Sequence, residues 1–225
     1  MILVLGGSGG LGRCVIAALN QPCIDWSRNG DPPVELTERK ALDQAALGIR
    51  SDIDGIVNCV GVNEIWPFDE LEIENVWDTF RVNAYLLAEV VQVLRNWNKL
   101  RPGARICNVI SNAANLPMTH SLAYNISKAA QQMLTRQMAR ELREYSIFGV
   151  NPNKLANTPM SKHIEQRVLQ LRGWTPEQAR QYQLAALPAG METPPFNVAR
   201  FIAYLMEWQN HPFITGCIFP YGGPQ

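Results

Sequence analysis

Ile2-Leu3-Val4-Leu5 runs directly into Gly6-Gly7-Ser8-Gly9-Gly10-Leu11-Gly12, and this junction is the most informative part of the chain. Four consecutive apolar residues are typical of a strand buried on both faces, and the glycines allow a tight turn. The amphipathic segment 13–19 that follows predicts a helix. The order of strand, glycine turn and helix predicts a nucleotide-binding turn, because a pyrophosphate can bind the backbone N–H groups of the helix N-terminus. A glycine-rich turn without a ligand is the simpler alternative.

Apolar runs and segments with helical spacing alternate along the rest of the chain. Strands are expected at residues 23–27, 34–36, 55–61, 105–110, 148–150 and 216–219. Helices are expected at residues 38–47, 71–97 (as one helix or two), 121–145, 159–171, 176–184 and 197–208. This alternation predicts an α/β fold, a single doubly wound parallel sheet of the Rossmann type with helices on both faces. We expect one domain over residues 1–225, because this length suits one hydrophobic core.

The composition excludes several classes of function. The chain has 47% hydrophobic and 18% charged residues, with 20 basic and 20 acidic side chains, so no net charge favours nucleic acid or an anionic membrane. No stretch reaches the roughly 18 apolar residues of a membrane span. The five cysteines are widely spaced and the three histidines are scattered, so we expect reduced thiols, a cytoplasmic location and no metal site.

Tyr124 and Lys128 are four residues apart and would share one face of a helix. An ammonium about 4 Å from a phenol is worth roughly 4 kcal/mol at an effective dielectric constant near 20, or about 3 pKa units. We therefore expect Lys128 to lower the pKa of Tyr124 and make it a general acid/base. Ser111, at the end of a predicted strand, would polarise the oxygen that receives the proton. An exposed helix pair is the alternative explanation of Tyr-x-x-x-Lys alone.

Several motifs occur together in one order. These are Gly6-x-x-x-Gly10-x-Gly12, Asn58-Cys59-Val60-Gly61, Asn83, Asn108-Val109-Ile110-Ser111 and Tyr124-Asn125-Ile126-Ser127-Lys128. Over nearly its whole length the chain thereby resembles the classical short-chain dehydrogenase/reductase family. The resemblance implies an enzyme that transfers a hydride between a nicotinamide cofactor and a small carbonyl or secondary alcohol. It also implies the catalytic set Asn83, Ser111, Tyr124 and Lys128.

The resemblance assigns each catalytic residue a role. Tyr124 would give the proton, and Ser111 would donate a hydrogen bond to the carbonyl oxygen. Lys128 would hold the nicotinamide ribose, and Asn83 would place a water in a proton relay behind it. The sequence departs from the family pattern at Leu5, at Cys59 and at Asn153-Lys154, where threonine, asparagine and Pro-Gly are usual. We therefore expect a reshaped loop under the nicotinamide.

The resemblance also implies a set of cofactor contacts. They are Gly6, Ser8, Gly9, Gly10, Leu11, Gly12, Ser27, Arg28, Asn29, Glu35, Leu36, Asn58, Val60, Gly61, Tyr124, Lys128 and Thr158. The cofactor is expected to be NADP(H), because a hydroxyl and an arginine at the end of the second strand suit a 2′-phosphate. If that strand ends earlier, Asp25 would bind the ribose 2′-hydroxyl instead and NAD(H) would be the cofactor.

Two other functions remain open at this stage. A non-catalytic NAD(P)-binding regulatory or scaffold protein of the same fold is one alternative, although such proteins usually lose the Tyr or the Lys. An epimerase or dehydratase is another, but these tend to be longer. A substrate loop is expected at roughly 158–196, and its variability in the family leaves the substrate unnamed. By analogy, the helices near 71–97 and 121–145 predict a homodimer or homotetramer.

Overall fold

The computed structural model describes residues 1–207 and 213–223. Within them a six-stranded sheet has the order β2-β1-β3-β4-β5-β6, and every neighbouring pair is parallel. The strands are β1 (Ile2–Leu5), β2 (Cys23–Trp26), β3 (Ile53–Asn58), β4 (Leu100–Val109), β5 (Ser146–Pro152) and β6 (Ile218–Tyr221). Their carboxyl ends therefore meet at one edge, where parallel α/β sheets bind ligands.

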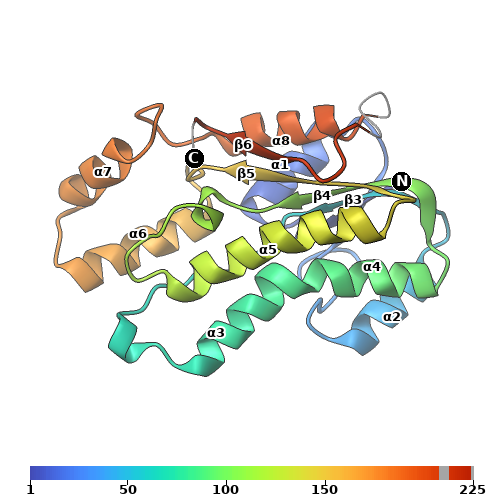
Figure 1. Ribbon diagram of the computed structural model, residues 1–225, viewed down its shortest axis with the longest axis horizontal. Coiled ribbons are helices and arrows are strands. Elements are labelled where there is room, and N and C mark those ends of the chain that lie inside the picture. The colour runs from blue at the N-terminus through green and yellow to red at the C-terminus, as the bar shows by residue number, and fades with distance from the viewer. Residues whose placement is uncertain (208–212, 224–225) are drawn as a thin grey trace.

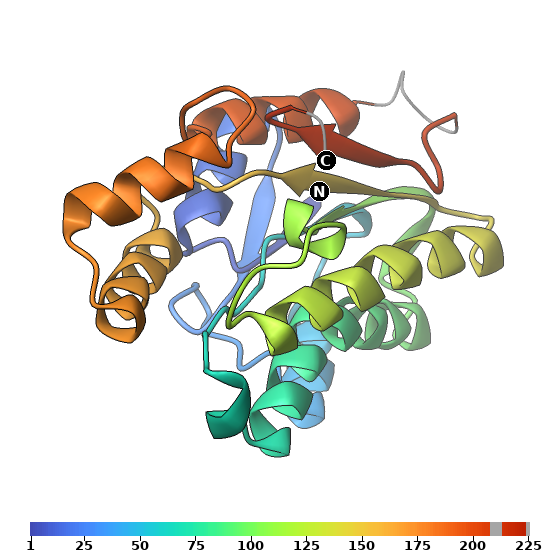
Figure 2. The same cartoon turned by 60° about the vertical axis from the view of Figure 1, so that its left-hand side comes forward.

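Helices cover both faces of the sheet, which confirms the predicted doubly wound α/β fold (Figure 1). One face carries α1 (Gly10–Ala18) and α8 (Pro195–Leu205), and these two helices contact each other. The other face carries α2 (Arg39–Gly48), α3 (Ile73–Phe80), α4 (Leu86–Asn96) and α5 (Leu122–Glu141). Figure 2 shows α6 (Pro159–Arg172) and α7 (Pro176–Ala185) beyond the sheet, on the side to which the strand arrows point.

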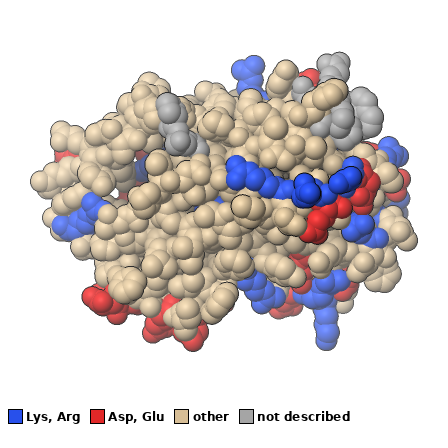
Figure 3. Space-filling view, in the orientation of Figure 1, with Lys and Arg blue, Asp and Glu red and all other residues tan. Residues whose placement is uncertain are grey.

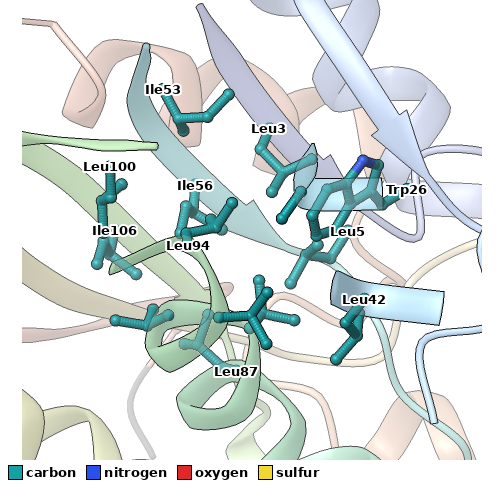
Figure 4. Packing of buried hydrophobic residues seen from close by; sticks show 14 of the residues in the cluster. Leu3, Leu5, Trp26, Leu42, Ile53, Ile56, Leu87, Leu94, Leu100 and Ile106 are labelled. Carbon is teal, nitrogen blue, oxygen red and sulfur yellow. The ribbon is translucent and has the colours of Figure 1, made fainter. Parts of the chain in front are cut away.

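Successive residues of β1 build the two cores. Leu3 and Leu5 belong to the cluster under α2 and α4, whereas Ile2 and Val4 belong to the cluster under α1 and α8. Alternate side chains of a strand point to opposite faces, so burial on both faces requires the continuous apolar run seen in the sequence. Figure 4 shows the first cluster, with Trp26 packed near Leu5.

One predicted strand is wrong. Residues 34–36 have no regular secondary structure, although Val34 and Leu36 are buried in the first core cluster. The N–H of Val34 donates to the carbonyl of Ser27, and the segment pairs with no strand of the described sheet. Pro32 and Pro33 immediately before it have no N–H to offer a ladder. Burial at this segment therefore comes without strand pairing.

Other boundaries differ by a few residues. The first helix begins at Gly10, the helix predicted at 121–145 ends at Glu141, and the last strand lies at Ile218–Tyr221. The predicted helix 197–208 corresponds to α8, but its last residue lies outside the described residues. Across residues 1–207 and 213–223, no helix has the length and apolar character that a membrane crossing requires.

The predicted helical stretch 71–97 contains three parts. A π-helical segment, η2 (Arg81–Tyr85), lies between α3 and α4. Asn83 is at its centre and is 1% exposed. Single π turns inside α-helices are often found at functional sites. Two short 3₁₀ turns, η1 (Phe68–Glu70) and η3 (Asn112–Ala114), follow β3 and β4 at the same edge of the sheet.

Candidate active site

Ser111 and Tyr124 meet at the carboxyl edge of the sheet. Ser111 follows β4, and its Oγ accepts a hydrogen bond of 3.2 Å from the N–H of Ala113. Tyr124 lies in the first turn of α5 and is 8% exposed. The Ser111 side chain lies close enough to the Tyr124 hydroxyl to affect the pKa of the phenol. The structure thus brings together two predicted site residues that come from different elements.

Burial dominates the acidity of Tyr124. It raises the pKa of the phenol, and the nearby Ser111 side chain lowers that pKa by a smaller amount. The expectation that Lys128 brings the Tyr124 pKa down towards neutrality is therefore wrong for this structure. The physical reason is that burial withdraws water from the phenolate, which costs more than the neighbouring groups return. At neutral pH the phenol keeps its proton.

Lys128 lies one turn further along α5 and is 3% exposed. Its Nζ is 5.7 Å from the centroid of the Tyr124 ring. The ammonium donates to Oε1 of Gln131 at 2.7 Å, and it lies 3.5 Å from the carbonyl of Val109. Burial lowers the pKa of Lys128 to about 7, against a smaller opposing effect of Cys59. Near pH 7 this side chain is therefore close to its own titration midpoint.

Asn83 fastens the segment after β3 to the helices. Its Oδ1 accepts from the N–H of Val62 at 2.8 Å, and its Nδ2 donates to the carbonyl of Val62 and to Oγ of Ser127, both at 2.9 Å. A Cβ added at Gly61 would lie 3.5 Å from both Asn83 Oδ1 and Lys128 Nζ. Asn83 and Lys128 therefore gather at the same backbone position, and the water relay remains a prediction.

The glycine turn folds back on itself. Gly6 has φ 73°, in the left-handed region that favours glycine, and a Cβ at Gly12 would lie only 2.1 Å from the Gly6 carbonyl oxygen. A Cβ at Gly9 would meet the Gly6 oxygen alone, at 3.1 Å. Gly9 is exposed and immediately precedes α1. This open backbone at a helix N-terminus fits the pyrophosphate of a dinucleotide.

Other predicted contacts surround the turn. Val60 lies beside Gly6, where an added Cβ would be 3.1 Å from its Cγ2. Thr158 packs over Gly10 in the same way, at 3.0 Å, and its Oγ1 caps α6 by accepting from the N–H of Ser161. Leu11 differs, because its side chain is buried in the second core cluster. Ser8 is half-buried.

The end of β2 carries the residues expected to choose between cofactors. The strand ends at Trp26, one residue earlier than predicted, and Asp25 lies inside it. Ser27 is buried, and its Oγ donates to Oδ2 of Asp25 at 3.0 Å. Arg28 and Asn29 are exposed beyond the strand. The hydroxyl of Ser27 is thus turned towards Asp25, while the guanidinium of Arg28 reaches solvent.

Asp25 and Glu35 are both held by local contacts. A Cβ added at Gly7 would lie 2.6 Å from the Asp25 carboxylate, which places that carboxylate against the glycine turn. The Glu35 carboxylate accepts from the hydroxyl of Thr37 at 2.7 Å and from its N–H at 3.2 Å. The Thr37 hydroxyl, followed by its N–H, lowers the pKa of Glu35. Leu36 is buried beside it in the first core cluster.

A family model described as short chain dehydrogenase matches residues 33–168 of the chain. This protein belongs to the short-chain dehydrogenase family. The match spans more than half of the chain, and it includes all four residues of the predicted catalytic set. Together with relatives that are named dehydrogenases and reductases, it makes the protein an oxidoreductase of this family.

Curated relatives cover nearly the whole of this short-chain dehydrogenase. L-xylulose reductase from Mus musculus is 28% identical, over 98% of this chain and 94% of that protein. The vibriobactin-specific 2,3-dihydro-2,3-dihydroxybenzoate dehydrogenase from Vibrio cholerae is 27% identical, over 92% of this chain and 88% of that protein.

Solved structures support the fold. Actinorhodin polyketide ketoreductase with NADPH has a TM-score of 0.89 at 19% identity, covering 99% of this chain and 95% of that chain. L-sorbose reductase from Gluconobacter frateurii has 0.85 at 19%, with the same coverage.

The structure adds residues that sequence reasoning missed. Asn108, Gln131 and Thr135 are fully buried and hydrogen-bonded to one another behind Lys128. Asn58, predicted as a cofactor contact, belongs to the same network because its Nδ2 donates to Oδ1 of Asn108 at 2.9 Å. A signal was present in the sequence. Every third or fourth residue along α5 is buried, and that inner stripe includes polar side chains (Tyr124, Ser127, Lys128, Gln131 and Thr135).

The segment after β5 is tied down by ion pairs. Glu64 accepts from Nε of Arg167 at 3.0 Å and lies 2.5 Å from Nε2 of His163, so α6 is linked to the segment after β3. Lys154, at the departure from Pro-Gly, pairs with Glu165 and Glu192 at 2.7 and 2.8 Å. These two ion pairs hold the loop around Asn153-Lys154 in place.

A hollow of about 560 Å³ lies between the segment after β3, α3 and the start of α6. Its lining includes Trp66, Asp78, Met160 and His163, but neither Ser111 nor Tyr124. Met160 also approaches the position of a Cβ at Gly61, at 4.0 Å, so the hollow adjoins the site on its Lys128 side. Within the described residues no three or more His, Cys, Asp or Glu side chains are grouped to hold a metal ion.

Proposed function

We propose that this short-chain dehydrogenase transfers a hydride between NADP(H) and a carbonyl or secondary alcohol, with Tyr124 as the general acid/base. The approach of the Ser111 and Tyr124 side chains at the carboxyl edge of the sheet carries the proposal, because an acid and an oxyanion donor converge there. When bound, the nicotinamide supplies the hydride. The residues of the glycine turn and the contacts predicted around it would hold the cofactor.

Each side chain has a separate task in the reducing direction. The buried phenol of Tyr124 stays protonated at neutral pH, so it gives its proton to the oxygen of the carbonyl as charge develops there. Ser111 donates a hydrogen bond to that same oxygen. Lys128, in its ammonium form 5.7 Å from the ring, stabilises the phenolate that remains. Asn83 holds the backbone next to Lys128 and would position the water of a proton relay.

The proposal favours NADP(H) over NAD(H). Arg28 is exposed just beyond β2 and can offer its planar guanidinium to a phosphate. Asp25, the residue that would favour NAD(H), lies inside the strand and accepts from Ser27. Two structures of the same fold, the ketoreductase and the sorbose reductase, contain NADPH. Stabilisation of the protein by NADH alone in a thermal-shift assay would overturn this preference.

The names of the relatives suggest where to begin with substrates. L-xylulose reductase and L-sorbose reductase are named for ketoses. We therefore propose a panel of ketoses with NADPH, alongside simple ketones. A cyclic dihydrodiol with NAD⁺ represents the dihydroxybenzoate dehydrogenases. No response of the wild-type protein to either nicotinamide would favour the non-catalytic scaffold instead.

Tyr124→Phe tests the assigned acid. It removes the proton donor and leaves the ring, so we expect turnover to fall by about 10²- to 10⁴-fold, the usual range for a general acid. NADPH affinity, measured by fluorescence titration, should change little. Tyr85→Phe is the matched control, because Tyr85 is exposed on η2 and its hydroxyl lies outside the catalytic set. Near-normal turnover of Tyr124→Phe with any accepted substrate would show that the assignment is wrong.

We also propose that the protein forms a homodimer or homotetramer through α3 and α5. Large apolar side chains on these helices are exposed, among them Ile73, Trp77, Ile126 and Met133. Figure 3 shows that the middle of the corresponding face carries few charged side chains, with acidic residues along its lower left margin and a mixture of basic and acidic residues on the right. A second copy would cover these side chains. Sedimentation equilibrium that shows only monomer at micromolar concentration would contradict this assembly.

A further inference from the structure

Gln131 contacts the ammonium of Lys128 from inside the protein. The two residues are three apart on α5 and share its buried face. Gln131 is 0% exposed, and its Oε1 accepts from Lys128 Nζ at 2.7 Å. Its Nε2 donates to Oδ1 of Asn108 at 2.6 Å and to the carbonyl of Val109 at 3.2 Å.

These partners determine which way the Gln131 amide faces. Asn108 Oδ1 and the Val109 carbonyl are acceptors, so the NH₂ group must point towards them and the oxygen must point towards Lys128. Asn108 is fixed in turn, because its Oδ1 also accepts from Asn58 and its Nδ2 donates to Oγ1 of Thr135. The hydroxyl of Thr135 is already donated to the carbonyl of Gln131. If the amide were inverted, its NH₂ group would face the Lys128 ammonium, and its oxygen would face Asn108 Oδ1.

We propose that Gln131 is a positioning residue for Lys128: its oriented amide oxygen holds the ammonium in place beside Tyr124 and keeps it in the charged form that the reaction needs. The proposal rests on the function proposed above, because that function gives the ammonium its task. The network also reaches the backbone of a predicted cofactor contact, since Asn58 Oδ1 accepts from the N–H of Val60. Gln131 thus links the position of Lys128 to that segment.

The surroundings of Lys128 leave Gln131 as its strongest acceptor. The titratable groups that face the ammonium are Tyr124 on its own helix and Cys59 after β3. Burial raises the pKa of Tyr124 and raises the pKa of Cys59 to about 12, so both are neutral near pH 7. No carboxylate forms an ion pair with Lys128 within residues 1–207 and 213–223. On the described elements β4 and η2, the Val109 carbonyl lies 3.5 Å from the ammonium, and Asn83 Oδ1 lies 3.5 Å from the same Cβ position at Gly61 as Lys128 Nζ; both groups are uncharged.

Gln131→Met tests the proposal without cofactor or substrate. It keeps the length of the side chain and removes the amide oxygen, so the buried ammonium loses a good acceptor. A hydrogen bond to a charged group is worth about a ten- to hundredfold change in proton affinity, so the midpoint of Lys128 titration should fall by about one to two pH units. The midpoint is measured by NMR of lysine labelled with carbon-13 at Cε. The Lys128 signal is assigned by its loss in Lys128→Met.

Gln132→Met is the matched control. It is the same substitution one residue along α5, where the side chain bonds to Asn115 and Asn151 and not to Lys128. The Lys128 midpoint should stay within about 0.3 pH units of wild type there. An unchanged midpoint in Gln131→Met, or an equal change in Gln132→Met, would overturn the proposal. If Gln131→Met does not fold, Gln131→Asn replaces it, because its amide is one methylene too short to reach the ammonium.

Activity provides a second readout. If charged Lys128 is required, rate is present below its pKa and lost above it, so the alkaline limb of kcat/KM should move to lower pH in Gln131→Met. A merely structural role would lower the rate at every pH and leave the limb in place. Because the NMR titration needs no catalysis, it distinguishes failure of this proposal from failure of the proposed function. If the protein has no reductase activity but the Lys128 midpoint still falls in Gln131→Met, the proposed function is refuted and the positioning role of Gln131 is not.

Discussion

Two groups of polar side chains shape the site, and they differ in burial. In the hydrogen-bond network behind Lys128, Asn58, Asn108 and Gln131 are all 0% exposed. Around Glu64 the partner side chains of His163 and Arg167 are 48% and 30% exposed, and Glu64 itself is 31% exposed. The first group consists mostly of neutral amides, whereas the second consists of charged or chargeable groups.

The difference shows that burial, more than charge, decides how strongly a contact holds. A buried polar group that loses its partner costs about 1–3 kcal/mol, because water cannot replace that partner. An ion pair near the surface is worth about 0.2–1 kcal/mol, because water and salt screen it. We therefore expect the Lys128 side of the site to be rigid and the α6 side to be adjustable. The burial of the two helices follows the same contrast, since α5 buries seven side chains and α6 buries only Ser161.

Asn108→Ala tests the rigid side most severely. It leaves the side-chain NH₂ groups of Asn58 and Gln131 without their shared acceptor and opens a small void. We expect the free energy of unfolding to fall by about 3 kcal/mol, measured by urea denaturation. Asn115→Ala is the control on the exposed side, where the lost hydrogen bond with Gln132 should cost less than about 0.5 kcal/mol. Equal losses in the two variants would remove the distinction by burial.

Lys128→Met has a smaller effect of opposite sign, and its pH dependence is specific. The folded pKa is lowered from 10.5 to about 7, so burial of Lys128 destabilises the protein fully below pH 7 and not at all above pH 10.5. Removing the charge recovers about 4–5 kcal/mol at pH 7, and leaving Gln131 Oε1 without its donor costs about 1–3 kcal/mol. We expect a net gain of about 2 kcal/mol in the unfolding free energy.

Urea denaturation at several pH values checks the sign of this effect. The gain of Lys128→Met should shrink as the pH rises from 7 towards 10, because wild-type Lys128 becomes neutral in the folded state. Lys40→Met on the exposed start of α2 is the control, and its effect should stay within about 0.5 kcal/mol at every pH. A gain for Lys128→Met that grows with pH would contradict the lowered pKa.

The same contrast explains which features the sequence could predict. The strands of the central sheet were predictable from Ile2–Leu5 onwards, because burial on both faces demands continuous apolar residues. Val34 and Leu36 show the limit of that reasoning. They are buried like strand residues, but sequence alone cannot tell burial with pairing from burial without it. The family was predictable because the order and spacing of several motifs are far more specific than any one motif.

The energetics of the site were less predictable. The spacing of Tyr124 and Lys128 indicated their proximity, but it did not reveal that burial raises the pKa of one and lowers that of the other. Gln131 was not identified, because a glutamine in a helix is usually exposed. In the structure Gln131 lies on the buried stripe of α5, where it contacts Lys128. The direction of its amide depends on Asn108 and Val109, which lie on a strand that is distant in the sequence.

Glu64→Gln tests the adjustable side and should have the smallest effect on stability. It removes the charge that pairs with Arg167 and His163, so the unfolding free energy should fall by less than about 1 kcal/mol. The local effect should be larger: amide hydrogen exchange in α6 should become several-fold faster, because few buried side chains hold this helix. Exchange in α5 should not change.

The pH dependence of this link has a defined sign. Burial raises the pKa of Glu64, but the hydrogen bonds with His163, with the N–H of Ile65 and with Arg167 together lower it below 4.5. The stabilisation is therefore present above about pH 4.5 and is lost as the pH falls through the folded pKa. Glu72→Gln, an exposed carboxylate before α3 in no ion pair among the described residues, is the control and should leave exchange in α6 unchanged. If Glu64→Gln slowed exchange in α6, or cost as much stability as Asn108→Ala, the adjustable side would be as rigid as the buried one.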